Sequence, residues 1–85
     1  MVLVQEVAFG RIDARLAQRL LQRRNSDDRV TLTHHELAVE LGTAREVISR
    51  QLKDFEHRGW VRLERGQIDI LEPGALAARA APVSV

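Results

Sequence analysis

LTHHELAVELGTAREVISRQLKDFEHRGW, residues 32–60, decides the fold because it contains two helix starts with a helix stop between them. In a capping box, each of two side chains accepts a hydrogen bond from the other residue's backbone amide. Two pairs have that spacing: Thr33 with Glu36, and Thr43 with Glu46. Gly42, which lies between the boxes, suits the left-handed backbone conformation that closes a helix. The stretch therefore predicts helices over about 34–41 and about 44–57, joined by a tight turn.

The second predicted helix has one apolar and one polar face. At about 100° per residue, the apolar face consists of Ile48, Leu52 and Phe55. The opposite face consists of Arg45, Glu46, Ser49, Arg50 and Lys53. Arginine can donate two parallel hydrogen bonds to guanine, a carboxylate can accept one from cytosine, and serine can bind bases or phosphates. The polar face therefore has the side-chain types that read base edges in duplex DNA.

Short segments on either side of these two helices predict strands and one further helix. Residues 61–64 and 68–70 alternate around a turn at Arg65 and Gly66, which predicts a β-hairpin, or wing, over 61–71. Residues 30–32 are β-branched or apolar and predict a short strand. Pro73 suits the first turn of a last helix that runs through Ala80.

Upstream, residues 4–24 place apolar side chains at helical spacing. Gly10 interrupts the pattern and Asp13 is a plausible cap, so the segment is either one helix or two helices that meet at a hinge between these residues. Four arginines recur along it, and a solvated helix edge is favoured over a DNA contact for them: Arg11, Arg15, Arg19 and Arg23. The whole chain predicts a mainly α fold with a small antiparallel β-sheet, in the order of a winged helix-turn-helix.

Composition limits the function classes open to the chain. Its 85 residues leave room for one small domain, and 45% hydrophobic with 29% charged residues is typical of a globular chain. The absence of cysteine excludes disulfides and thiolate metal sites. His34 and His35 have no third metal ligand at suitable spacing, and the carboxylates and histidines do not have the spacing of a catalytic set. We therefore expect no enzyme activity and no metal or cofactor in this segment.

Charge and hydropathy favour a cytoplasmic protein with no membrane partner. No apolar run approaches the roughly 20 residues that span a bilayer. Gln5 and Glu6 fall where a signal peptide needs apolar residues. The net charge of +1 is too small to indicate nucleic acid by itself, so the distribution of charge has to carry that argument. Trp60 has no second exposed aromatic residue beside it and is predicted to anchor the core or the wing.

Residues 32–60 resemble the helix-turn-helix of Crp/Fnr transcription regulators. REVISR, residues 45–50, is similar to the family's recognition-helix pattern Arg-Glu-Thr-Val-Ser-Arg. FGRIDARLA, residues 9–17, resembles the family's hinge between a long dimerisation helix and the DNA-binding domain. The resemblance implies three regions: the end of the dimerisation helix with the hinge at 1–12, the winged helix-turn-helix domain at 13–80, and a flexible tail at 81–85.

The resemblance also implies roles for individual side chains. Glu46 and Arg50 are implied as the principal base readers, with Arg45 and Ser49 tuning the preferred half-site. The implied contacts with the DNA backbone come from Thr33, His35, Thr43, Lys53 and Arg65. Ala44 departs from the Ser or Thr of many members, so the hydroxyl of one expected phosphate contact is missing.

By the same resemblance, we expect sequence-specific binding of double-stranded DNA, with helix 44–57 in the major groove and hairpin 61–71 as the wing. The implied partners are a palindromic operator and a second copy in a full-length homodimer, with RNA polymerase left open. The family's N-terminal cyclic-nucleotide-like sensor domain is not in this sequence, which is expected to be a C-terminal fragment, with a stand-alone gene product as the alternative. The residues leave one alternative open, a winged helix that binds an acidic protein through the face around Arg50.

Overall fold

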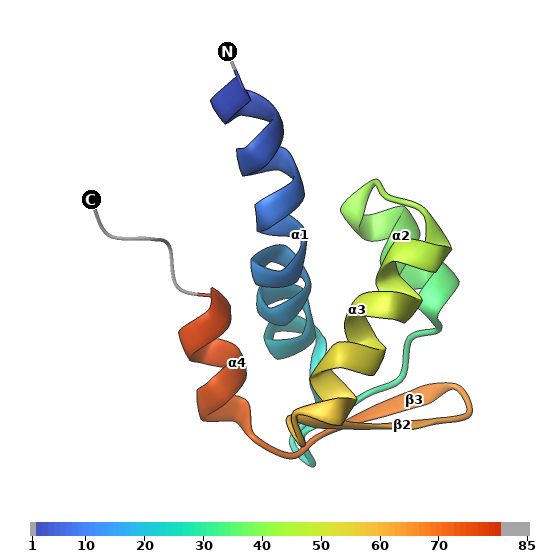
Figure 1. Cartoon of the computed structure of the whole chain (residues 1–85). Coiled ribbons are helices and arrows are strands. Elements are labelled where there is room, and N and C mark those ends of the chain that lie inside the picture. The colour runs from blue at the N-terminus through green and yellow to red at the C-terminus, as the bar shows by residue number, and fades with distance from the viewer. Residues whose placement is uncertain (1, 81–85) are drawn as a thin grey trace.

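The computed structural model describes the backbone of residues 2–80 and the side chains of residues 12–80. Within that part of the chain, four helices and one small antiparallel sheet follow the predicted order, which confirms the fold class (Figure 1). The elements are α1 (Val2–Arg23), β1 (Arg29–Val30), α2 (His34–Leu41), α3 (Arg45–His57), β2 (Val61–Glu64), β3 (Gln67–Ile70) and α4 (Pro73–Ala80). The predicted tail at 81–85 lies outside the described residues.

The turn between α2 and α3 depends on Gly42. This residue has φ +67°, and its N–H donates to the carbonyl oxygen of Val39 at 3.2 Å. The N–H of Thr43 donates to the carbonyl oxygen of Ala38 at 3.0 Å. Together these two hydrogen bonds form a Schellman motif, which satisfies carbonyl groups at the end of α2 that have no partner inside the helix. The predicted helix stop at Gly42 is therefore confirmed.

Of the two predicted capping boxes, one is confirmed and one is wrong. Thr33 Oγ1 accepts from the N–H of Glu36 at 3.0 Å, and Glu36 Oε1 accepts from the N–H of Thr33 at 2.8 Å. At α3 the N-cap is Ala44, which makes no side-chain cap hydrogen bond. The N–H of Thr43 already donates to the carbonyl oxygen of Ala38, so it is not available to the Glu46 carboxylate as a capping box requires. The structure therefore starts α3 one residue later than a Thr43 cap requires.

The sheet has the strand order β1-β3-β2, and both pairings are antiparallel. The wing is the β2–β3 hairpin, whose last pair before the turn is Glu64 with Gln67, and Gly66 in the turn has φ +72°. The strand predicted over 30–32 is shifted, because β1 pairs with β3 only through Arg29 and Val30. The chain leaves the sheet after Val30 to reach the capped start of α2.

α1 is one continuous helix from Val2 to Arg23, so the two-helix alternative with a break between Gly10 and Asp13 is wrong. A glycine inside a helix costs only about 1 kcal/mol, which packing of the helix can offset. Asp13 does not start a new helix; its Oδ2 accepts from Arg79 Nη1 of α4 at 2.7 Å. Figure 1 shows α4 alongside α1, and the two helices pack against each other.

The core receives apolar side chains from every helix and strand of the described chain. Phe55, the largest fully buried side chain, has its ring centroid 5.4 Å from that of Trp60, which packs on the core as predicted. The buried set is Leu16, Ala17, Leu20, Val30, Leu37, Ala38, Leu41, Ile48, Leu52, Phe55, Val61, Ile68, Ile70 and Leu76. None of the described helices is long and apolar enough to cross a membrane.

The arginines of α1 bind α2. Arg15 and Arg23 are exposed, as predicted for a solvated helix edge, while Arg19 is half-buried, and all three also hold α2. Arg15 Nη2 donates to the carbonyl oxygen of Leu41 at 2.7 Å. Arg19 and Arg23 bind the two carboxylate oxygens of Glu40 at 2.8 and 2.7 Å. The hydrogen bond from Arg19, supported by that from Arg23, lowers the pKa of Glu40 below its usual value. The side chain of Arg11 lies outside the described residues.

The conformation of Gly42 leads to a stability prediction. We expect Gly42→Ala to lower the free energy of unfolding by about 1–2 kcal/mol, because a Cβ at positive φ is strained even where no atom lies near it. Gly74→Ala is the matched control, since Gly74 lies in α4 without positive φ and with open space around it. This control should raise the free energy of unfolding by about 0.5 kcal/mol. Urea denaturation of both variants measures the difference, and equal effects would contradict the prediction.

Candidate functional site

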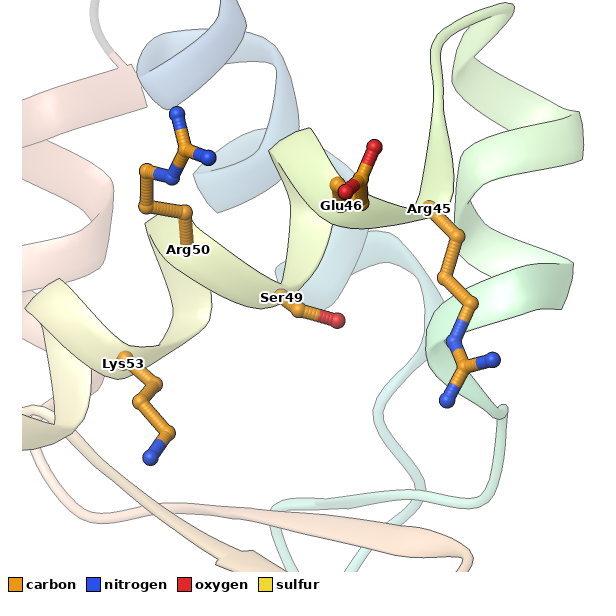
Figure 2. A pocket seen from close by; sticks show the side chains of 5 residues that line it. All are labelled: Arg45, Glu46, Ser49, Arg50 and Lys53. Atoms are coloured by element: carbon orange, nitrogen blue, oxygen red, sulfur yellow. The ribbon is translucent and has the colours of Figure 1, made fainter.

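The structure brings five of the sequence-predicted residues together on one face of α3. Ile48, Leu52 and Phe55 have no exposed surface, so the opposite side of the helix faces solvent. The side chains on that side line one concavity (Figure 2) and are called here the outer face: Arg45, Glu46, Ser49, Arg50 and Lys53. Ser49 is half-buried, and the other four are exposed. The α3 face predicted from helical periodicity is therefore present.

The cations of the outer face are not used to hold the fold together. Within residues 12–80, Arg45, Arg50 and Lys53 make no ion pair, and neither does Arg65 at the tip of the wing. The other arginines of that region bind carboxylates or a backbone carbonyl: Arg15, Arg19, Arg23, Arg24, Arg29, Arg58, Arg62 and Arg79. The unpaired cations therefore concentrate positive charge on α3 and the wing, where an anionic partner can approach.

A hydrogen bond across the turn connects the outer face with α2. His34 Nδ1 lies 2.9 Å from Ser49 Oγ. Burial, followed by the nearby positive charge of Arg45, lowers the pKa of His34 below 6.5. The sequence gives no sign of this contact, because no local spacing pairs the first residue of α2 with the middle of α3. The contact follows from the packing of the two helices.

A second concavity lies between the start of α2 and the wing. Thr33 and His35, both predicted DNA-backbone contacts, line it together with Arg45 of the outer face. The other lining residues are His34, Glu64, Gly66, Gln67 and Ile68. Thr33 Oγ1 accepts a hydrogen bond in the capping box, which leaves the hydroxyl proton available to an external acceptor. Arg45 lines both concavities and therefore connects the outer face to this region.

Two predicted backbone-contact residues lie outside both concavities. Thr43 is half-buried in the turn between α2 and α3, where its N–H is bound to Ala38. Arg65 is exposed in the turn of the wing.

Among the residues that the structure describes, no group of three or more His, Cys, Asp or Glu side chains is placed to hold a metal ion. The site therefore offers cations, a carboxylate and a hydroxyl for hydrogen bonding.

Comparison with known proteins gives a consistent family. Residues 14–79 match the family described as the Crp-like helix-turn-helix domain. A protein of Mycobacterium tuberculosis H37Rv named CRP-like cAMP-activated global transcriptional regulator is 43% identical over 84 residues. That match covers 88% of this chain and 38% of the relative, so the chain spans less than half of the relative's length.

Solved structures agree with the sequence matches. A putative transcriptional regulator of the Crp/Fnr family from Eubacterium rectale has a TM-score of 0.80 and 34% identity, covering 92% of this chain and 37% of that one. The catabolite activator protein of Thermus thermophilus has a TM-score of 0.77 and 33% identity, covering 91% and 37%. On the match over 14–79 and these likenesses, the chain belongs to the family of Crp-like helix-turn-helix domains, which occur in Crp/Fnr-type transcription regulators.

Proposed function

We propose that this domain binds double-stranded DNA sequence-specifically, as the DNA-reading domain of a Crp/Fnr-type transcription regulator. The observation that carries the proposal is the outer face of α3, whose cations have no ion-pair partner among residues 12–80. An α-helix fits the major groove of B-DNA, and the second helix of a helix-turn-helix is the one that enters it. α3 is therefore the recognition helix of the proposal.

The outer face has the groups needed to read base edges. Arg50 and Arg45 can each donate two parallel hydrogen bonds to guanine, and Glu46 can accept one from the amino group of cytosine. Ser49 is the neutral group among them. Because all four lie on one side of α3 beside Lys53, a helix laid in the groove presents them to the bases at the same time.

The remaining predicted residues suit the phosphate backbone. Thr33 and His35 lie between the start of α2 and the wing, and Arg65 extends the positive charge to the wing tip. Lys53 lies on the last part of the outer face, and Thr43 lies in the turn before α3. Contacts of this kind fix the register of a protein on the duplex without reading its sequence. In the proposal, these five residues orient the domain while the base readers select the site.

The proposal extends to the assembly of the whole regulator. The longer relatives are named transcriptional regulators. Regulators with this motif bind two half-sites about one helical turn apart, so that a two-fold dimer matches a palindrome. We therefore propose a homodimer on a palindromic operator, with a sensor domain outside this chain and RNA polymerase as a further partner. The proposal needs no cofactor within this domain.

Arg50 is expected to act as a base reader. Arg50→Ala should weaken binding to the preferred duplex by roughly 1–3 kcal/mol and relax the selected sequence at one base pair. The measurements are fluorescence-anisotropy titration and selection from random duplexes. Arg24→Ala is the control, since it removes the same charge from an exposed residue paired with Asp28 at 3.2 Å. Equal weakening on preferred and scrambled duplexes would make Arg50 a phosphate contact, and a parent domain that binds no duplex would favour the protein-binding alternative.

Arg65 is expected to act on affinity alone. Arg65→Ala should weaken binding to all duplexes alike, and the slope of log K against log salt should become shallower by about 0.9, because one phosphate counterion fewer is released. The control is Arg62→Ala in the same hairpin, since Arg62 is already engaged by Glu64 and Asp69 at 3.5 and 3.7 Å. An altered base preference in Arg65→Ala, or an unchanged salt slope, would contradict a phosphate-binding wing.

A tethered pair tests the proposed dimeric arrangement. Two copies joined through a coiled coil added before Met1 should bind a palindrome about 100- to 10,000-fold more tightly than one copy binds a half-site, through effective concentration alone. Duplexes in which one half-site is moved by half a helical turn serve as the control. The gain should disappear on them, because the two α3 helices can no longer face the same side of the duplex. An equal gain on both spacings would contradict the two-fold arrangement.

A further inference from the structure

Ser49 is the member of the outer face that is bound to another element of the domain. Its Oγ lies 2.9 Å from His34 Nδ1, and within residues 12–80 no other side chain of the outer face has a hydrogen bond to a different element. His34 is the first residue of α2 and is half-buried, so its ring is held by the packing of α2 against α3. The ring is therefore placed to fix the Ser49 hydroxyl.

The protonation of His34 Nδ1 decides what Ser49 presents to a base. If Nδ1 has no proton, it accepts the hydroxyl proton, and the lone pairs of Oγ accept from the amino group of cytosine or adenine. If Nδ1 is protonated, it donates to Oγ, and the hydroxyl proton turns outward to the oxygen of guanine or thymine. The same serine therefore selects opposite kinds of base edge in the two states.

The surroundings of the ring oppose a second proton on it. Burial and the Arg45 guanidinium on α3 both lower the pKa of His34 below 6.5. The other titratable groups that line the adjoining concavity are His35 on α2 and Glu64 on β2. A neutral imidazole has one protonated and one unprotonated nitrogen, and the Ser49 hydroxyl can donate its proton to the unprotonated one. An unprotonated Nδ1 with the proton on Nε2 satisfies both groups.

We propose that His34 is a positioning residue for base reading, whose unprotonated Nδ1 accepts the Ser49 hydroxyl proton so that Ser49 selects a base with an amino group. This inference rests on the proposed function, because it needs α3 in the major groove. It assigns a specificity role to a residue of α2 that lies outside the outer face. His34 acts through Ser49.

The ring state can be measured without DNA. Long-range ¹⁵N–¹H correlation spectra of the free domain near neutral pH should show His34 with its proton on Nε2 and with Nδ1 unprotonated. Ser49→Ala should shift the Nδ1 resonance and leave the resonances of His57, exposed at the end of α3, unchanged. A proton on Nδ1, or a spectrum of His34 that is insensitive to Ser49→Ala, would overturn the inference whatever the DNA experiments show.

Selection from random duplexes measures the effect on base reading. At about pH 8, where the ring is neutral, Ser49→Ala should reduce the preference at one base pair by about 2- to 10-fold, as expected for one hydrogen bond. His34→Phe should reduce the preference at the same pair, and the double variant should show no further loss. His57→Phe should select the parent sequence. Losses from Ser49→Ala and His34→Phe that add, or that fall at different base pairs, would overturn the inference.

A conservative variant separates positioning from a structural role. His34→Asn retains a short polar side chain that can accept from Ser49 but does not titrate, so it should restore the preference that His34→Phe loses. As the pH falls below 6.5 and through the lowered pKa of His34, the parent should lose its preference at the Ser49 base pair because the ring gains its second proton, while His34→Asn should not change. His35 lines the adjoining concavity and is a proposed phosphate contact, so any change there would alter the affinity for all sequences alike.

The outcomes separate this inference from the proposed function. A parent domain without any sequence selection would overturn both. A parent that selects a sequence, with Ser49→Ala changing one base pair and both His34 variants leaving that pair and its pH dependence unchanged, would overturn the role of His34 alone.

Discussion

Burial of the apolar side of α3 is the constraint on which the rest of the structure depends. Ile48, Leu52 and Phe55 have no exposed surface, and each such side chain contributes roughly 1.5–3 kcal/mol relative to exposure. Because they lie on one side of the helix, their burial turns the opposite side to solvent without any polar contact having to hold it there. The outer face is thus oriented by the core. Substitutions on the outer face can therefore change the binding of a partner with little effect on folding.

The arginines divide into two groups, those that connect elements of the fold and those that have no ion-pair partner. Arg15, Arg19 and Arg23 bind the end of α2, and Arg79 binds Asp13 of α1, so these arginines connect helices around the core. Those of α3 and the wing tip have no ion-pair partner in residues 12–80. The formal net charge of +1 conceals this division, since six of the twelve acidic residues form ion pairs within residues 12–80, all with arginines outside the outer face and the wing tip. A nearly neutral chain therefore presents a positive surface in one place.

Features that depend on the spacing of a few neighbouring residues could be predicted from the sequence, whereas features that depend on the packing of distant segments could not. The Thr33 capping box, the Gly42 helix stop and the wing turn each depend on local spacing, and the structure has all three. The second capping box failed because the end of α2 already uses the backbone of Thr43. The contacts of Glu40 with α1 and of His34 with Ser49 join residues far apart in sequence, and no local pattern marks them. The DNA contacts of individual side chains stay predictions.

On the proposed function, Glu46 accounts for how a face rich in cations discriminates between sequences. Phosphate attracts arginine and lysine whatever the base order, so the cations raise the affinity for every duplex. A carboxylate brought toward a polyanion lowers that affinity unless a cytosine amino group donates a hydrogen bond to it. Glu46 is the acid of the outer face and has no ion-pair partner among residues 12–80. Its repulsion from the phosphates therefore lowers the affinity for most sequences, and only the few that place a cytosine amino group beside it offset this loss. A single module buries only about 600–1,000 Å² of protein surface on DNA, which limits how much specificity added attraction can supply. On the proposed function, selectivity therefore comes as much from the sequences that Glu46 penalises as from those that the arginines bind.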